Sequence, residues 1–276
     1  MEYGLFDFTD EYYRSIDAIN VSSLKELRKS PKHYWLALNK PQVRVPAFDF
    51  GNAFHWSILE PKKFNSDVVV KPKFSGTGSR AEGKRWEEDH KGKVIITAGE
   101  HSNIKAMAEV VKNHPRFKEL MSMEHKIEQT LLWRDPITQQ NCKAKLDLIV
   151  RNPDGTYTAV DLKSTLDACY SAFKQSVAAY GYFVQAAYYY DGLTRTSGPV
   201  KHFEFLAVEK ANPHGVGSYV CSEQMIEFGR NIYNSLLKKV LTIKRTKEYS
   251  DYESREMFVS GYTVAKWASD CGLNHD

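Results

Sequence analysis

Two aspartates and a lysine lie in neighbouring apolar segments, where their types and spacing could support catalysis. Asp147 and Asp161 are each flanked by apolar residues, and Lys163 follows Asp161 by two positions. Side chains of a β-strand alternate between faces, so Asp161 and Lys163 are expected on the same face. Carboxylates in apolar surroundings are rarely left without a partner, and hard divalent cations such as Mg²⁺ bind carboxylate oxygens. A metal-dependent phosphodiesterase would need this arrangement.

The segment 143–165 predicts a β-hairpin that holds these groups. Two runs rich in β-branched residues flank Asn-Pro-Asp-Gly at 152–155, which is typical of a turn. A turn centred near Asp154 places Asp147 opposite Asp161, with their Cβ atoms about 4.5–5.5 Å apart. Carboxylates at that distance repel unless a cation lies between them. The alternative is an exposed Asp-x-Lys pair in solvent, which is the more common origin of such a short pattern.

Two further elements could carry residues to the same place. Residues 51–61 predict a short helix with His55 on one side, and residues 126–133 alternate as a strand containing Glu128. A single histidine on a helix is more often a hydrogen-bonded core residue than a ligand. Glu128 could equally be a surface residue.

Residues 167–192 predict one long, aromatic-rich helix. Gln185 and Tyr189 are four positions apart and therefore share a face. Packing in the core explains most of the aromatic rings, but it explains Gln185 less well. Other helices are expected at 24–38, divided by Pro31 and preceded by a capping box at Ser23, and at 100–120.

The stretch 71–93 is basic, rich in glycine and without clear periodicity, so we expect a mobile surface segment. It contains Arg80, Lys84 and Trp86. Basic residues mixed with aromatic rings suit a nucleic-acid strand, because charges meet phosphates and rings stack on bases. An ordinary solvated loop is an equal alternative.

Composition places these features in an ordinary globular protein of 276 residues, with 42% hydrophobic and 26% charged residues. We expect a single domain, 1–276, with a core at about 45–245 and terminal segments that pack on it or on a neighbour. The net charge of +4 means that any nucleic-acid surface must be local. Four scattered cysteines without a C-x-x-C pattern, no signal sequence and no membrane span predict a cytoplasmic location.

In chain order, the motifs resemble the PD-(D/E)XK nuclease superfamily, in particular its RecB-like branch and the exodeoxyribonuclease VIII (RecE) nuclease family. The resemblance covers nearly the whole chain. It rests on Gly51-x-Ala53-x-His55-x-x-x-Leu59-Glu60-Pro61, Lys143-Ala144-Lys145-Leu146-Asp147, Asp161-Leu162-Lys163-Ser164-Thr165 and Tyr182-x-x-Gln185-Ala186-Ala187-x-Tyr189, with Ser30-Pro31-x-x-Tyr34-Trp35 and Trp267 in addition. The chain departs from the general pattern in lacking a proline before Asp147 and in having Asp instead of Glu at 161.

The resemblance implies an α/β, restriction-endonuclease-like fold with a central mixed β-sheet flanked by helices. It also implies Mg²⁺, for which Mn²⁺ could substitute, and no iron–sulfur cluster, because the cysteines lack the clustered C-terminal spacing. The implied metal ligands are His55, Asp147, Asp161 and the carbonyl of Leu162. The implied catalytic residues are Lys163, Glu128, Gln185 and Tyr189. The candidate DNA contacts are Arg80, Lys84, Trp86 and Lys145.

The function implied by the same resemblance is 5′-to-3′ digestion of one strand of linear double-stranded DNA. The 3′ tails would then be used for recombination by a RecT-like single-strand annealing protein. A ring-shaped homo-oligomer, with a tetramer favoured over a trimer, would enclose the duplex. Two alternatives remain open: a catalytically inert DNA-end-binding or annealing factor, and an endonuclease or nickase of the same fold.

Overall fold

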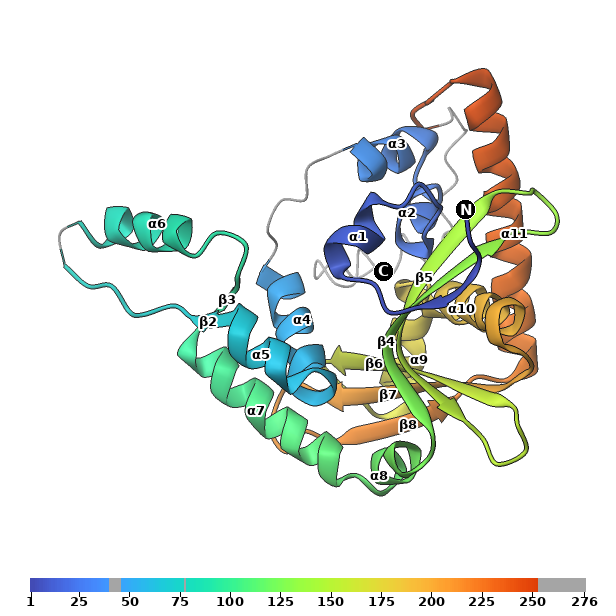
Figure 1. The fold of residues 1–276 in the computed structure, drawn as a ribbon. Coiled ribbons are helices and arrows are strands. Elements are labelled where there is room, and N and C mark those ends of the chain that lie inside the picture. Colours follow the sequence, from blue (N-terminus) through green and yellow to red (C-terminus); the bar gives the residue numbers. More distant parts are fainter. Residues whose placement is uncertain (40–45, 77, 253–276) are drawn as a thin grey trace, which may run out of the picture.

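The computed structural model describes residues 1–39, 46–76 and 78–252, which are built around a central sheet (Figure 1). Six strands of the described chain are arranged in the order β1-β4-β5-β6-β7-β8. The strands are β1 (Gly4–Phe6), β4 (His125–Arg134), β5 (Asn141–Arg151), β6 (Tyr157–Thr165), β7 (Val200–Glu209) and β8 (Val216–Val220). Within this sheet of the described chain, β6 and β7 pair in parallel and all other neighbouring strands pair antiparallel. The predicted mixed sheet is therefore confirmed.

Helices cover both faces of this sheet, so two apolar clusters form, one on each side. One face is covered by α2 (Val21–Glu26), α3 (Pro31–Asn39), α9 (Tyr170–Ala179), α10 (Tyr182–Ser197) and α11 (Glu223–Thr246). The opposite face is covered by α4 (Pro46–Leu59), α5 (Pro61–Asp67), α7 (Ala98–Asn113) and α8 (Pro115–Ser122). A sheet buried on both faces explains why its central strands read as nearly continuous apolar runs.

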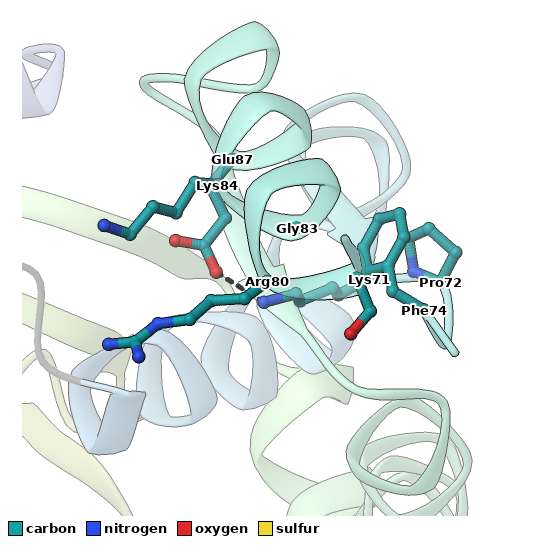
Figure 2. A pocket seen from close by; sticks show the side chains of 8 residues that line it. Lys71, Pro72, Phe74, Arg80, Gly83, Lys84 and Glu87 are labelled. Atoms are coloured by element: carbon teal, nitrogen blue, oxygen red, sulfur yellow. Dashed lines mark hydrogen bonds and ion pairs between the residues drawn. The ribbon is translucent and has the colours of Figure 1, made fainter. Parts of the chain in front are cut away.

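An arm leaves this body between β2 (Val68–Val70) and β3 (Val94–Ile96), which form a separate parallel pair. The arm extends away from the central sheet and carries α6 (Ser79–Asp89) (Figure 1). The sequence lacks clear periodicity here. Glycines at 76, 78 and 83 lower the helix propensity of this stretch, so the sequence alone does not indicate α6. Arg80 and Lys84 extend from one side of α6, as Figure 2 shows.

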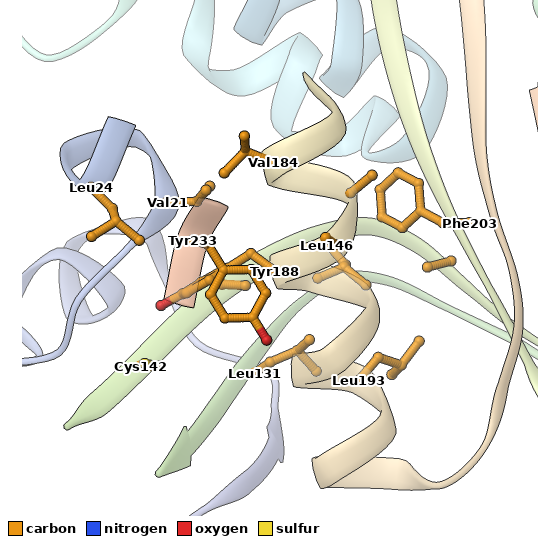
Figure 3. Packing of buried hydrophobic residues seen from close by; sticks show 14 of the residues in the cluster. Val21, Leu24, Leu131, Cys142, Leu146, Val184, Tyr188, Leu193, Phe203 and Tyr233 are labelled. Atoms are coloured by element: carbon orange, nitrogen blue, oxygen red, sulfur yellow. The ribbon is translucent and has the colours of Figure 1, made fainter. Parts of the chain in front are cut away.

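The larger apolar cluster lies between the sheet and the α10–α11 pair (Figure 3). Tyr188 of α10 and Tyr233 of α11 are both fully buried, and their ring centroids are 5.4 Å apart at 90°. Such edge-to-face pairs add about 0.5–1.5 kcal/mol to the stabilisation from burial. Each hydroxyl has a partner, since Tyr188 donates to the carbonyl of Ile19 and Tyr233 donates to Asp191. This packing fixes α10 against the strands that carry the acidic residues.

The helix predicted at 167–192 is interrupted. α9 ends at Ala179, and α10 begins at Tyr182. Gly181 between them has φ +62°, in the left-handed region that glycine tolerates best. The helix predicted at 100–120 is likewise divided, because Pro115 cannot continue α7 and instead begins α8.

The N-terminal segment does more than lie over the core. β1 pairs with β4 as the edge strand of the sheet, and α1 (Asp10–Ser15) follows it. The capping box predicted at Ser23 is wrong, because Asn20 caps α2 by accepting a hydrogen bond from the Ser23 amide. Pro31 begins α3 and so divides the helical stretch as predicted.

Three cysteines of the described chain are free thiols: Cys142 is buried, Cys221 half-buried and Cys169 exposed. No helix in the described ranges is both long and apolar enough to cross a bilayer. Trp267 and Cys271, named in the sequence analysis, lie outside the described residues.

Candidate active site

The β4–β5 ribbon is irregular where Glu128 and Asp147 face each other across the ladder. Glu128 has φ +51°, which is unusual for a residue other than glycine. Leu146 packs in the cluster beneath α10, whereas Leu148 packs in the cluster on the opposite face. Residues two apart in a regular strand share a face, so β5 changes face at Asp147. Such locally unusual backbone is characteristic of functional sites.

This irregularity brings the two acids to a histidine on α4. One ligand atom each from His55, Glu128 and Asp147 lies within 4.8 Å of the other two. The Nδ1 of His55 is 3.4 Å from the Oδ2 of Asp147. Two carboxylates and an imidazole form a donor set suited to a divalent ion, and carboxylates favour Mg²⁺ or Mn²⁺. The three side chains therefore fit a metal centre.

The electrostatics of this triad reflect a concentration of negative charge. Burial lowers the pKa of His55, but the charges of Asp147 and Glu128 outweigh burial and raise it to about 9. Burial and the neighbouring Asp147 raise the pKa of Glu128 to about 7, against the opposing effects of His55 and Lys145. Burial also acts to raise the pKa of Asp147, but His55 and Lys163 outweigh it and hold that pKa below its usual value. Strong perturbation in one cluster marks a candidate functional site.

Asp161 and Lys163 occupy the neighbouring strand and face α10. The ammonium of Lys163 forms an ion pair with Asp161, whose exposure is 3%. Gln185 of α10 donates from Nε2 to Oδ1 of Asp161 over 2.8 Å. The predicted shared face of Asp161 and Lys163 and the reach of Gln185 towards them are therefore present. Asp161 is not part of the three-residue group that contains His55.

Asp147 of the triad and the Asp161–Lys163 pair are linked through the backbone of β6. The amide of Leu162 donates to Oδ2 of Asp147 over 2.7 Å. The hairpin register is the predicted one, with Leu148 opposite Val160. Burial raises the pKa of Asp161, Lys163 opposes that rise, and Asp147 adds to it. Asp147 and Asp161 are thus coupled electrostatically although their side chains have different partners.

Lys145 is surrounded by acids instead of standing free at the surface. Its ammonium is 2.5 Å from Oδ1 of Asp10 and 3.6 Å from Oε2 of Glu128. Asp10 also pairs with Lys63 over 2.7 Å. Burial raises the pKa of Asp10, but Lys145 and Lys63 outweigh burial and lower it to about 2. Sequence reasoning missed Asp10, because no local pattern connects it to a strand more than a hundred positions later.

Two tyrosines of α10 lie near this centre. Tyr189 follows Gln185 by one turn and is half-buried, with its ring centroid 6.4 Å from that of Phe203. Tyr182 precedes Gln185 by about one turn, and the Nζ of Lys163 is 4.7 Å from its ring centroid. Tyr182 was not among the expected site residues. Its helical spacing from Gln185 is the signal that could have identified it.

The other expected DNA contacts lie on the arm. Arg80 and Lys84 line an open pocket of about 450 Å³ that Lys71 and Phe74 also border (Figure 2). The Trp86 ring stacks on His90, with centroids 4.0 Å apart. Glu87 lines the same pocket and pairs with Lys71 over 2.6 Å, and none of the residues of the acidic centre contributes to it.

Comparison with known proteins identifies the family. Residues 20–258 match the family described as a PDDEXK-like domain of unknown function (DUF3799). A crystal structure of a putative exonuclease from Eubacterium rectale is similar, with 15% identity, coverage of 94% of this chain and 98% of that one, and a TM-score of 0.61. At that identity the likeness concerns the fold.

The structure of SSO0001 aligns with 13% identity over 69% of this chain and 85% of that one, and its TM-score of 0.31 carries no argument. Comparison with curated protein sequences finds no match. The family match extends from α2 to beyond α11 and includes every described element that carries the acidic centre, Lys163 and Gln185. The chain belongs to the PDDEXK-like family DUF3799.

Proposed function

We propose that this protein is a metal-dependent 5′-to-3′ exodeoxyribonuclease that acts on the ends of double-stranded DNA. The observation that carries the proposal is the cluster of His55, Glu128 and Asp147 beside the Asp161–Lys163 pair. The membership in a PDDEXK-like family supports it. The direction of digestion and the RecE-type role rest on the sequence resemblance.

The chain's own donors define where a divalent ion would bind. His55, Glu128 and Asp147 would hold it, and Asp161 and the carbonyl of Leu162 are the further ligands proposed from sequence. A bound Mg²⁺ or Mn²⁺ supplies activation of water and neutralisation of phosphate charge. The partly buried ion pairs around these residues hold the donors in place before substrate arrives.

Lys163 is placed to stabilise negative charge on the phosphate. Burial lowers its pKa, but Asp161 and Asp147 outweigh burial and raise the pKa above its usual value. The side chain therefore remains an ammonium at neutral pH and acts as a charged donor instead of a general base. Gln185 holds the Asp161 carboxylate and so fixes the partner of that ammonium. Positioned donors of this kind act on charge that develops in the transition state.

The proposal also includes a protein partner and an oligomeric state. A 3′ single-stranded product suits a RecT-like annealing protein. Enclosure of the duplex by a ring-shaped homo-oligomer, with a tetramer favoured, would compensate for the modest net charge of +4.

Cleavage of end-labelled DNA tests the function directly. Linear duplex should be degraded from its 5′ ends in Mg²⁺ and remain intact in EDTA, and covalently closed circular duplex should remain intact in both. Asp161→Asn should abolish degradation, because one ligand charge is lost. The matched Asp154→Asn variant, which changes an exposed aspartate in the hairpin turn, should remain active. Cut circles would indicate an endonuclease, and DNA binding without any cleavage would indicate an inert end-binding protein.

The arm offers a separate prediction. If the arm binds DNA, Arg80→Ala combined with Lys84→Ala should lower the affinity for DNA. It should also reduce the slope of log affinity against log salt by up to about 2, since each lost phosphate contact contributes about 0.9. Fluorescence anisotropy at several salt concentrations measures the slope. The Lys238→Ala and Lys239→Ala pair on the exposed side of α11 is the control. An unchanged slope in the arm variant would assign the arm to another role.

A further inference from the structure

Two lysines from distant parts of the chain converge on the ring of Tyr182. The Nζ of Lys163 is 4.7 Å from the ring centroid, and the Nζ of Lys25 from α2 is 5.8 Å from it. Ammonium groups at such distances are attracted to the π face of an aromatic ring. α2 and α10 pack together in the same apolar cluster, which fixes Lys25 beside the candidate active site.

Lys25 carries a positive charge that the described residues do not neutralise. Its ammonium donates to the carbonyl of Tyr180 over 3.0 Å, and no carboxylate of the described chain is placed within ion-pair distance of it. The side chain is half-buried and packs over Gly181, where a Cβ atom would lie 3.3 Å from its Cδ. Burial lowers the pKa of Lys25 to about 8, and the charge of Lys163 adds to this effect. An anion at this position would be stabilised by both lysines.

Tyr180 provides an exposed aromatic surface next to these cations. Its exposure is 64%, and its ring centroid is 5.5 Å from that of Tyr182, with an angle of 32° between the planes. The residue lies where α9 gives way to α10, and the left-handed Gly181 turns the chain there. An exposed ring beside a half-buried ring and an unneutralised ammonium combines the two groups that bind a nucleotide. One stacks on the base, and the other contacts the phosphate.

We propose that Lys25, Tyr180 and Tyr182 form a nucleotide-binding subsite next to Lys163. The base of an unpaired nucleotide stacks on Tyr180, which Tyr182 supports, and a phosphate of the same strand contacts Lys25. This inference rests on the proposed nuclease function, and it assigns the subsite to single-stranded instead of paired DNA. It therefore predicts that the enzyme favours ends whose terminal nucleotide is already unpaired.

Steady-state cleavage of end-labelled DNA in Mg²⁺ tests the subsite. Substrates carry a short unpaired end, either intact or with one abasic nucleotide placed at each unpaired position in turn. Tyr180→Ala should raise KM by about 5- to 150-fold, the range expected for loss of one base–aromatic stack, and change kcat much less. In the wild type one abasic position should raise KM similarly, and in Tyr180→Ala that position should have no further effect.

The lysine is tested by salt dependence. Lys25→Gln should raise KM and reduce the salt slope of binding by about 0.7, as for one phosphate contact on a single strand. Lys25→Arg should restore most of the wild-type KM and most of the wild-type salt slope. Lys29→Gln, an exposed lysine that pairs with Glu26, and Tyr252→Ala, an exposed tyrosine beside His33, are matched controls that should behave as wild type. Thermal melting checks that each variant is folded.

The two proposals fail in different ways. Wild-type protein that does not cleave any DNA would overturn the nuclease function and with it the subsite. Wild-type protein that cleaves DNA, with Tyr180→Ala and Lys25→Gln both unchanged in KM and salt slope, would overturn the subsite alone. Equal sensitivity of wild type and Tyr180→Ala to every abasic position would likewise exclude stacking on this residue.

Discussion

Lys163→Ala is expected to lower the rate of DNA cleavage by about 10²–10³-fold, the effect typical of removing one preorganised donor to transition-state charge. The lysine is half-buried beside Asp161 and remains protonated, so its charge is available without rearrangement. DNA affinity should change much less, because one ammonium contributes little to binding along a whole duplex. Single-turnover cleavage and fluorescence anisotropy measure the two quantities separately.

The control is Lys201→Ala, since this exposed lysine pairs with Asp154 at the distant hairpin turn. Its cleavage rate should match that of the wild type. A two-fold effect of Lys163→Ala would show that Lys163 is not part of the reaction. A loss of affinity equal to the loss of rate would instead make it a binding residue.

Gly229→Ala is expected to have the largest effect on stability, because α10 and α11 touch at this position. A Cβ atom there would lie 2.2 Å from the carbonyl oxygen of Phe183 and 2.7 Å from the Cβ of Ala187. The first contact is with backbone, so a rotamer change cannot relieve it. Overpacking costs about 1–3 kcal/mol and occasionally more. Each kcal/mol lowers the melting temperature of a chain of this size by about 2–4 °C, so the melting temperature of the variant should fall by several degrees.

Gly99→Ala provides the matched substitution. Gly99 is exposed in the first turn of α7, and only the Thr97 hydroxyl lies as near as 4.0 Å to its added Cβ. That variant should melt at or slightly above the wild-type temperature, since alanine favours a helix. A Gly229→Ala protein with the melting temperature of the wild type would show that α10 and α11 can move apart at little cost in free energy.

The parts of the site that depend on local pattern could be predicted from sequence. The turn formers at 152–155 determine the register of the hairpin, and strand alternation places Asp161 and Lys163 on one face. Helical spacing places Gln185 on the side of α10 that faces them. These are short-range consequences of backbone geometry.

The remaining features depend on tertiary contacts. The change of face at Asp147 coincides with the left-handed Glu128 opposite it on a different strand, whereas alternation alone predicts a regular ladder. The contact between Asp10 and Lys145 joins segments with no shared pattern. Lys25 is unremarkable on α2 until the turn at Gly181 brings Tyr180 to it. Periodicity cannot reveal such contacts, because each involves a partner remote in sequence.

The pairing of β1 with β4 has a consequence for biosynthesis. Phe6 pairs with Thr130, about 120 positions later in the chain. At translation rates of about 5–20 residues per second, the first strand waits about 6–25 s for its partner to be made. During that interval the backbone of β1, including that of Phe6, has no strand to pair with. Closure of the sheet edge therefore has to wait until β4 has been made, and delivery of Asp10 to Lys145 until the first half of β5 has followed, whereas the hairpin that holds Asp147 and Asp161 joins segments that are adjacent in the chain.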